Sequence, residues 1–566
     1  MLFGKGRELH MNNTNITVYR AILDLNQDRL SAPALYAGGQ CLSYAGLFEL
    51  ADKTADILTT AGLMEGDMII AQIHGTFESV ALLLAASKIG VSVMMLTENT
   101  MEGVLAVLVE QLDIRFIFVM EKFFLTIADY SFIDDDRMVV VLPKQSEPGA
   151  ASERLPGASS NIVKWSTFIN FPANVKAKEV ARGHHTMNIC STSGSAGYPK
   201  AIVHTNQSCV ELFNLFGPDV SGWTTDDLFA CVFPFFLTSG QSFNLFLPLA
   251  SGTPSLIDPD VSLEAFYQGL LENRPTIVLL VKYNWLRLIA MTKEQGVKPD
   301  LSCLRTAYSV GALLTGAERE MIDQFLSECG SSCKVSSLFG LSETNSILAC
   351  ESGNGEDGSF MPLEGVNVIC RSVQTGELLG PGMRGQLFFR TPCLMKRYLK
   401  SPQKTKKALV RDDDGTVWFN TEDVGYLTED GGFVIEGRLN DLFRYGDKSV
   451  YVFEIKKLLE ECEEVSSCEV YFNRTRDELW AYIVPENKSL IPGGEDSSER
   501  RKAQEEEVKR LEDFLIASGK LELLPCKYRF LKTILLAKSG KPDIKAMLDL
   551  EDYIISDHIS DYSESP

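Results

Sequence analysis

The densest group of potentially reactive side chains is the segment Ser191-Thr-Ser-Gly-Ser-Ala-Gly-Tyr-Pro-Lys200. Four hydroxyl groups and two glycines fall within seven residues, and Lys200 follows a Tyr-Pro pair. Glycine lets consecutive backbone N–H groups turn inward, and such a turn binds oxyanions. The segment therefore predicts a phosphate-binding loop, with a flexible surface loop as the alternative. It is not a Walker loop, because its spacing is Gly-x-x-Gly-x-Pro-Lys and Ala201 follows the lysine.

A second group is Phe339-Gly-Leu-Ser-Glu-Thr344. The Glu343 carboxylate is suited to Mg²⁺, which prefers one or two carboxylates together with phosphate oxygens. The aromatic ring of Phe339 is suited to stacking on a base. The alternative is purely structural, with Ser342 capping a helix.

Three further polar segments follow in the second half of the chain. In Asn420-Thr-Glu-Asp-Val-Gly425, the Asp423 carboxylate is able to accept hydrogen bonds from two sugar hydroxyls. Gly437-Arg438 with Asp441 is a charged turn, and Ser539-Gly-Lys541 places a lysine on a glycine turn. Each of the three, taken alone, is better explained as a solvated structural turn.

The composition limits the kind of function. The chain has 566 residues, of which 45% are hydrophobic and 23% charged, as in an ordinary globular protein. Its formal net charge of −22 argues against nucleic acid or an anionic membrane as the main partner. No apolar run reaches the roughly 18–20 residues of a transmembrane segment. Thirteen scattered cysteines without a Cys-x-x-Cys pair indicate a reducing compartment, so we expect a cytoplasmic protein.

Apolar runs alternate with helical stretches in the first 150 residues and again over residues 186–337. Expected strands are 68–73, 91–96, 115–119, 138–142 and 276–281, and expected helices are 47–63 and 77–89. Such alternation predicts α/β layers with parallel strands. Residues 358–437 instead show short strands separated by charged turns, which predicts a small β-rich subdomain. A break follows near residues 437–441, and the acidic residues from Asp549 onward predict a solvated tail.

The order of these five polar segments resembles the adenylate-forming superfamily, which contains acyl-CoA synthetases, peptide-synthetase adenylation domains and beetle luciferases. The resemblance extends from about residue 40 to residue 547, and residues 192–200 are its most specific part. It implies an α/β fold with a large N-terminal domain of two α/β subdomains and a small β-barrel-like subdomain. A small mobile α+β C-terminal domain completes the fold. The corresponding boundaries are 1–437, 438–548 and, for the acidic tail, 549–566.

The resemblance also implies an activity. An ATP- and Mg²⁺-dependent ligase of this kind converts a carboxylic acid into an acyl-adenylate, releases pyrophosphate, and passes the acyl group to the thiol of coenzyme A. A carrier-protein phosphopantetheine or an amine is the alternative acceptor, and a catalytically silent nucleotide-binding homologue is a further alternative.

Site residues are carried over by position in the motifs. The pyrophosphate loop corresponds to Thr192, Ser193, Ser195 and Lys200. Gly311, within Ser309-Val-Gly-Ala, resembles the segment that lies along the adenine.

The remaining nucleotide contacts lie on the other motifs. Phe339 is expected on the second face of the adenine, Ser342 at the α-phosphate and Glu343 at Mg²⁺. Asp423 and Arg438 resemble the ribose contacts. Lys541 resembles the catalytic lysine that bridges the acyl carboxylate and the α-phosphate, where it acts with Glu343 and Lys200.

Several positions depart from the family pattern. Leu237 replaces an often-found histidine, Ala201 and Glu422 replace glycines, and Asn440 replaces the Asp or Lys of the hinge. None of these changes removes a charge that adenylate formation needs. Phe235, Phe236 and Leu237 suggest an apolar pocket for a fatty or aromatic acid, and core packing is the alternative. His204, on an apolar run after the loop, is expected to be structural.

Overall fold

Parallel strands with continuous apolar sequences form the centre of this computed structural model. The structure describes residues 15–97, 102–121, 123, 137–143, 161–180, 182–191, 200–352, 358–439, 442–445, 448–474, 476, 478–492, 498–518, 524–535, 542–550 and 553–555. They form two units, of which the first is Met1–Asn367 with Arg390–Phe419 and the second is Val368–Phe389 with Asn420–Pro566.

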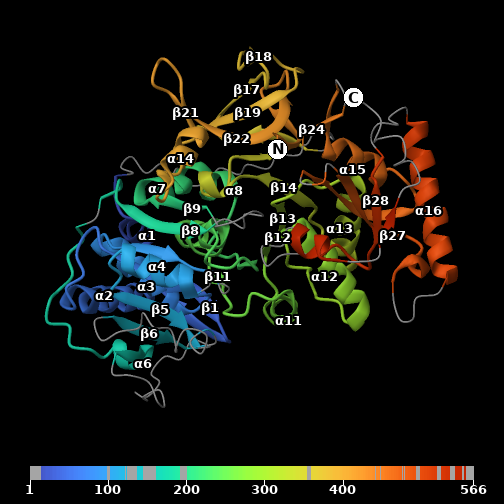
Figure 1. Cartoon of the computed structure of the whole chain (residues 1–566). Helices are drawn as coiled ribbons and strands as arrows, with labels where there is room; N and C mark the ends of the chain where they lie inside the picture. Colours follow the sequence, from blue (N-terminus) through green and yellow to red (C-terminus); the bar gives the residue numbers. More distant parts are fainter. Residues whose placement is uncertain are drawn as a thin grey trace. The chain divides into compact units, whose positions relative to one another are not determined.

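One sheet of the first unit carries strands that are mostly parallel (Figure 1). Strands β14, β13, β12, β10, β11 and β1 lie side by side in this order and in parallel, and β2, β15 and β16 extend the sheet antiparallel. The bounds of these strands are β1 Pro33–Ala37, β2 Gln40–Ser43, β10 Phe229–Cys231, β11 Ser255–Leu256, β12 Ile277–Val281, β13 Thr306–Val310, β14 Val335–Phe339, β15 Ala349–Glu351 and β16 Ser359–Pro362.

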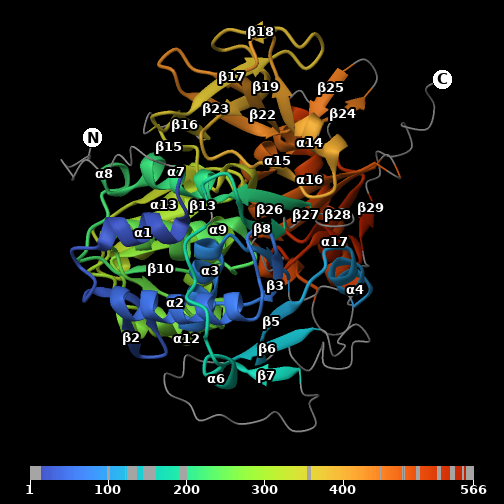
Figure 2. The same ribbon diagram turned by 90° about the vertical axis from the view of Figure 1, so that its left-hand side faces the viewer.

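The first unit also contains an eight-stranded sheet, in the order β20-β9-β8-β4-β3-β5-β6-β7. Figure 2 shows β5, β6 and β7 side by side at one edge. Its strands are β3 Met68–Gln72, β4 Ser92–Met95, β5 Phe116–Met120, β6 Met138–Leu142, β7 Ile162–Lys164, β8 Thr186–Ser191, β9 Ala201–Thr205 and β20 Arg397–Tyr398.

Helices connect and cover these strands. They are α1 Val18–Asn26, α2 Tyr44–Thr60, α3 Phe77–Ile89, α4 Glu102–Gln111, α6 Trp165–Phe168, α7 Asn206–Phe216, α8 Pro218–Ser221, α9 Thr238–Gln241, the π-helix η1 Ser242–Phe246, α10 Leu247–Ser251, α11 Leu263–Asn273, α12 Lys282–Gln295, α13 Gly316–Glu328, the 3₁₀ turn η2 Ser342–Thr344 and α14 Pro402–Ala408. Helix α3 is buried on nearly all sides, begins at the Thr76 cap and ends at Gly90, where φ is 74°. Apolar residues accordingly occur on every side of this helix, together with the buried polar residues Glu78, Ser79 and Ser87.

The sequence predicted the elements best where strands are buried on both faces. Residues 138–142 and 77–89 form β6 and α3 with the expected bounds, and every described residue of β5 and β12 is buried. Parallel strands covered by helices on both faces are continuously apolar, which makes them easy to recognise. The mixed α/β fold class is confirmed.

The second unit begins with a sheet of short strands, in the order β18-β17-β19-β22-β23. The strands are β17 Asn367–Arg371, β18 Leu378–Leu379, β19 Gly385–Arg390, β22 Val417–Leu427 and β23 Phe433–Arg438, and β21 Leu409–Arg411 pairs with the start of β22 in the first unit. Strand β22 continues past the polar Thr421, because the Thr421 hydroxyl donates a hydrogen bond to the Leu387 carbonyl and the side chain is thus satisfied within a buried strand.

The rest of the second unit is an α+β layer. It contains the hairpin β24 Leu442–Tyr445 and β25 Lys448–Tyr451, the sheet β26 Val465–Asn473, β27 Glu478–Pro485, β28 Lys527–Phe530 and β29 Ile554–Ile555, and the helices α15 Val452–Glu460, η4 Lys488–Leu490, α16 Ser498–Ala517 and α17 Ile544–Leu548. Strand β29 pairs with β28, so this part of the predicted acidic tail belongs to the sheet. The domain boundaries at 437 and 548 stay predictions.

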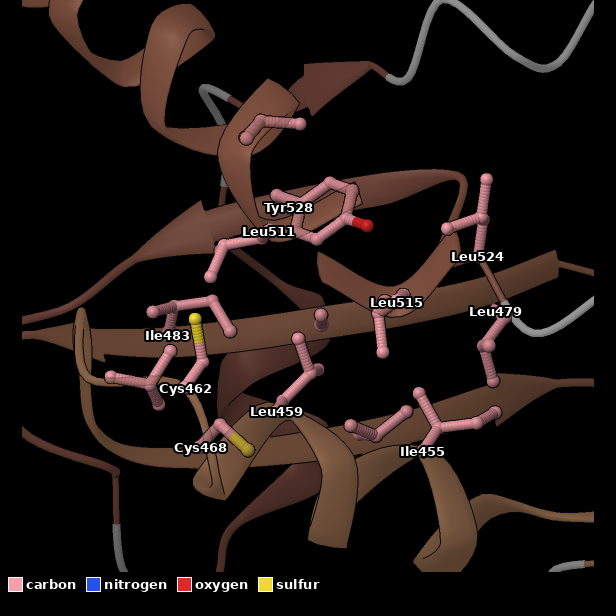
Figure 3. Close-up of a cluster of buried hydrophobic side chains, with 14 of the residues drawn as sticks. Ile455, Leu459, Cys462, Cys468, Leu479, Ile483, Leu511, Leu515, Leu524 and Tyr528 are labelled. Carbon is pink, nitrogen blue, oxygen red and sulfur yellow. The ribbon is translucent and has the colours of Figure 1, made fainter. Parts of the chain in front are cut away.

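One apolar cluster holds this layer together. Figure 3 shows Leu459 of α15 pointing into the same cluster as Leu511 and Leu515 of α16 and Ile483 of β27. All four side chains are fully buried. The charged helix α16 is therefore fixed by a narrow apolar face.

None of the helices that the structure describes is long and apolar enough to span a bilayer. All thirteen cysteines lie within described segments and are free thiols.

We expect Leu459→Ala to lower the unfolding free energy of the second unit by about 2–5 kcal/mol, because the lost methyl groups leave a cavity. Leu378→Ala is the matched control, since the Leu378 side chain is 65% exposed in the same unit. It should cost less than about 0.5 kcal/mol. Urea denaturation measures the unfolding free energy of both variants, and hydrogen exchange of β26 and β27 reports on the stability of this core. Equal losses of unfolding free energy in the two variants would contradict the assignment of this core.

Candidate active site

Two predicted site segments follow neighbouring parallel strands. Gly311 comes directly after β13, and Gly340-Leu-Ser-Glu343 comes directly after β14. The two strands pair in parallel, with Val310 opposite Leu338. Carboxyl ends of parallel strands lie at one edge of the sheet, where α/β proteins bind ligands. The fold therefore brings both segments to the same edge.

Glu343 is a buried carboxylate with a defined orientation. The Tyr398 hydroxyl donates a hydrogen bond to Glu343 Oε1 at 2.7 Å, and the Met395 amide donates to the Glu343 carbonyl at 2.7 Å. Within the described part of the chain, Oε2 of this carboxylate accepts no hydrogen bond. One oxygen is thus held by the protein and the other is available to a ligand.

The turn that carries Glu343 is strained and tightly packed. Asn345 and Ser346 have φ values of 54° and 82°, which are unfavourable for residues other than glycine. A Cβ atom on Gly340 would lie 2.0 Å from the Ser346 carbonyl oxygen, so this position requires glycine. The Asn345 amide compensates by donating to the carbonyls of Ser208 and Cys393, at 2.9 and 3.1 Å.

Lys200 lies beside the same tyrosine. Its Nζ is 5.3 Å from the centroid of the Tyr398 ring. Strand β20 pairs with β9, which begins one residue after Lys200, and the Leu399 amide donates to the Ala201 carbonyl at 2.8 Å. Tyr398 therefore brings together two predicted site residues that are 143 positions apart. Thr192, Ser193 and Ser195 lie outside the described residues.

His204 fixes the backbone at Ser342. Its Nε2 is 2.8 Å from the Ser342 carbonyl oxygen, which requires a proton on Nε2. Burial lowers the pKa of His204 to about 4, so the ring is neutral at pH 7. The expected structural role of His204 thus extends to the turn of Glu343. Ser342 itself is the first residue of η2 and not its cap, so the alternative of a capping serine does not hold.

The segment after β13 has its own support. Gly311 has a φ of 82°, which glycine adopts without strain. Downstream, Glu318 accepts from the Thr315 amide at 2.9 Å in the capping box of α13, and its other oxygen pairs with Lys282 Nζ at 2.9 Å. Lys282 directly follows β12, so this ion pair connects the end of β12 with the first turn of α13.

A network of buried side chains holds the proposed acid-binding segment. Phe235, Phe236 and Leu237 are all buried after β10. The Gln241 amide donates to the Phe235 carbonyl at 2.8 Å and accepts from Asn188 of β8 at 2.6 Å. Gln241 thus connects this segment to β8, the strand that precedes the predicted phosphate loop. Whether the three apolar side chains contact an acid or only pack the core stays a prediction.

The predicted ribose contacts lie in the second unit and contact each other. Asp423 and Arg438 face each other across β22 and β23, with Nε and Oδ1 2.8 Å apart. The Asp423 amide donates to the Thr421 hydroxyl, and Arg438 donates to the Thr421 carbonyl at 3.0 Å. The carboxylate is buried while the arginine is half-exposed. Asn440 and Lys541 lie outside the described residues.

Glu422 explains one departure from the family pattern. Its φ is 60°, in the left-handed region that glycine adopts freely. The Asn420 side chain supports this conformation by accepting from the Glu422 amide at 3.1 Å. The chain therefore holds a residue with a side chain in a conformation that glycine adopts at lower energy.

The sequence did not reveal that Tyr398 and Gln241 help to organise this site. It also did not reveal that His204 orients the backbone at Ser342. Tyr398 had no local signal, because its contacts to Lys200 and Glu343 arise only when β20 pairs with β9. Gln241 and Asn188 were detectable in principle, since uncharged polar residues within apolar runs are usually hydrogen-bonded when buried.

The comparison with known proteins agrees with this geometry. The family model described as "AMP-binding enzyme" matches residues 24–399. The acyl-CoA ligase sidI of Aspergillus fumigatus is 24% identical over 435 residues, which are 74% of this chain and 71% of that protein. The fatty acid–[acyl-carrier-protein] ligase ScoC of Streptomyces coeruleorubidus is 24% identical over 534 residues, 91% of this chain and 92% of that protein.

Solved structures show the same fold. The structure of the anthranilate CoA ligase AuaEII in complex with anthranoyl-AMP has a TM-score of 0.77 at 17% identity, and the match covers 94% of this chain and 97% of that chain. The chain belongs to the AMP-binding enzyme family, within the adenylate-forming superfamily.

Glu422→Gly should raise the unfolding free energy by about 0.5–1 kcal/mol, because relief of the left-handed strain exceeds the entropy that glycine adds to the unfolded chain. Glu429→Gly is the control, since Glu429 is exposed and has no positive φ. That change should be destabilising. Urea denaturation tests both, and a similar loss of stability in the two variants would exclude strain at Glu422.

Proposed function

We propose that this protein activates a carboxylic acid with ATP, forms an acyl-adenylate with release of pyrophosphate, and passes the acyl group to the thiol of coenzyme A. The observation that supports it most is the group Lys200, Tyr398 and Glu343, in which one tyrosine orients a cation and a carboxylate. This group lies within the 24–399 region that matches the AMP-binding family.

Glu343 fits a magnesium ion. Mg²⁺ is usually bound through one or two carboxylates, substrate phosphates and water. Glu343 offers Oε2 for this purpose, while Tyr398 holds Oε1. When bound, the ion would neutralise negative charge on the phosphate oxygens of ATP. Lys200 and the donors of the loop would add to this neutralisation.

The remaining predicted site residues contact the adenine, the ribose and the α-phosphate in this proposal. Gly311 lets the backbone approach the adenine, and Phe339 covers the opposite face. Asp423 accepts from the ribose hydroxyls, and Arg438 keeps the carboxylate in place. Ser342 contacts the α-phosphate. These roles are carried over from the family pattern, and the local geometry of each segment is compatible with them.

The chemistry needs alignment and charge neutralisation more than proton transfer. A carboxylate oxygen of the acid attacks the α-phosphorus, and the bond from that phosphorus to the pyrophosphate breaks. Lys541 would hold the two anionic reactants together. In the second step the thiol sulfur attacks the acyl carbon, AMP leaves, and the thiol proton passes to solvent.

The acid is proposed to be apolar, either fatty or aromatic. This segment carries no charged side chain at Phe235, Phe236 or Leu237. The Gln241 amide donates a hydrogen bond to the Phe235 carbonyl, so we assign it to the backbone and not to a substrate contact. The names of the relatives include a fatty acid ligase and an anthranilate CoA ligase, which agree with this range.

A carrier-protein thiol or an amine is the alternative acceptor. ScoC, which the chain matches over most of its length, acts on a carrier protein, and the amide bond synthetase McbA of Marinactinospora thermotolerans has a TM-score of 0.71 at 19% identity. We place the protein in the cytoplasm on the basis of its unpaired cysteines. The hinge at Asn440 also stays a proposal.

The first test is acid-dependent exchange of labelled pyrophosphate into ATP, over a panel of fatty and aromatic acids. Exchange followed by thioester formation after addition of CoA supports the proposal. Lys541→Ala should slow exchange by at least about 100-fold, because one donor to the developing charge is lost. Transfer from pre-made acyl-adenylate should survive this change.

Lys545→Ala is the control for Lys541→Ala, since Lys545 is exposed on α17. It should leave the exchange rate unchanged. Absence of pyrophosphate exchange with every acid would favour a catalytically silent homologue. Exchange without formation of a CoA thioester would favour another acceptor. Exchange at the wild-type rate in the Lys541→Ala variant would show that the role of Lys541 is wrongly assigned.

Tyr398→Phe tests the orientation of Glu343. The ring over Lys200 remains, but the hydrogen bond to a charged acceptor is lost, which costs about 1.5–3 kcal/mol. The Mg²⁺ concentration for half-maximal exchange should therefore rise about tenfold or more. Tyr471→Phe, the same chemical change in β26, should not alter it. An unchanged Mg²⁺ requirement in Tyr398→Phe would contradict the proposed metal contact.

A further inference from the structure

A strongly basic surface stands out in an acidic chain. Residues 390–411 contain eight cationic residues and no Asp or Glu, although the whole chain has a formal charge of −22. All eight side chains are exposed. We call them the basic strip: Arg390, Lys396, Arg397, Lys400, Lys404, Lys406, Lys407 and Arg411.

Five of these eight cations have no carboxylate partner among the residues that the structure describes. Among the described residues, no carboxylate forms an ion pair with Lys396, Arg397, Lys400, Lys404 or Lys406. Lys400 Nζ donates to the uncharged Gln111 side chain at 2.8 Å, and Lys396 Nζ lies 3.4 Å from the His184 carbonyl. In α14 only Ala408 is buried, so the lysines of this helix project into solvent.

The basic strip borders the candidate active site. It runs through β20 and α14, and β20 pairs with β9 directly after Lys200. Within β20 the side chains alternate, because Tyr398 is buried against Glu343 whereas Arg397 is exposed. One face of the same short strand therefore orients the candidate catalytic carboxylate, and the other carries positive charge on the surface.

We propose that the basic strip is a docking surface for an acidic carrier protein, whose phosphopantetheine thiol is a second acceptor of the acyl group beside CoA. The proposal rests on the acid activation proposed above and adds a macromolecular acceptor to it. Exposed cations spread over a strand and a helix are complementary to a broad acidic protein surface. The phosphates of free CoA form a compact group, which calls for convergent cations instead. Such charge complementarity raises association rates and selects among partners.

The transfer step balances without a further reactant. The carrier's thiol sulfur forms a bond to the acyl carbon, and the bond between that carbon and the AMP phosphate oxygen breaks. The thiol proton goes to solvent, and AMP leaves with the electron pair. The basic strip contributes only to docking, so it should affect the KM for the carrier and not the chemical steps.

The test compares two triple charge reversals with the same change in net charge. The first is Lys400→Glu with Lys404→Glu and Lys406→Glu, in the basic strip. The control is Lys53→Glu with Lys178→Glu and Lys334→Glu, at exposed lysines elsewhere in the first unit. The acceptors are a holo acyl carrier protein of strongly negative net charge, free CoA, and free pantetheine, each with an acid that supports pyrophosphate exchange.

We expect the wild-type protein to transfer acyl groups to the holo carrier with a KM that rises with salt. The basic-strip variant should raise this KM at least about tenfold with kcat retained, and its KM should depend less on salt. Pyrophosphate exchange and transfer to pantetheine should stay within about twofold in both triple variants.

Three outcomes would overturn the proposal: no transfer from the wild-type protein to the holo carrier, equal KM values for the two triple variants, or a loss confined to free CoA. The last outcome would assign the basic strip to the CoA phosphates. A failure of the proposed function itself is distinct, since exchange would then be absent in the wild-type protein.

Discussion

The hydrogen bond from the Tyr398 hydroxyl to Glu343 is the contact on which the rest of the candidate site depends. It exists because β20, almost 200 residues after β9, returns to pair with it. The same pairing places the Tyr398 ring beside Lys200. A buried carboxylate is costly unless it is hydrogen-bonded, so the tyrosine both stabilises Glu343 and leaves one oxygen for a ligand. The pairing of the two-residue strand β20 with β9 thus places Tyr398 between the Lys200 cation and the Glu343 carboxylate.

The site also carries energetic costs that other contacts offset. Asn345 and Ser346 adopt left-handed conformations beside Glu343, and Glu422 does so beside Asp423. Strain of this kind persists only where neighbouring groups fix the backbone. Here the Asn345 side chain bonds two carbonyls, and His204 holds the carbonyl of Ser342. Strained backbone conformations thus lower the stability of the fold but keep the Glu343 and Asp423 carboxylates in position, as is common at functional sites.

The polar interior of the first unit serves the same end. Gln241 bridges the apolar segment after β10 and strand β8, which precedes the predicted phosphate loop, and Lys282 with Glu318 connects the end of β12 with the first turn of α13. The two charges in the Lys282–Glu318 link are paired, so this link positions its segments without an unpaired buried charge. The predicted acid segment, Gly311 and Glu343 thus belong to the first unit, whereas Asp423 and Arg438 belong to the second.

The sequence by itself determined the α/β class and the chemistry-bearing motifs, since buried parallel strands are continuously apolar and a Gly-rich hydroxyl loop before Lys200 is typical of phosphate binding. It also indicated Glu343 and Asp423, because short motifs carry their own turn chemistry. Tertiary structure alone decided that Tyr398 and His204 support the site, that Glu422 adopts a left-handed conformation, and that Ile554–Ile555 join a sheet. The physical reason is that these roles depend on strand pairing and backbone torsion between distant residues, which no local pattern records.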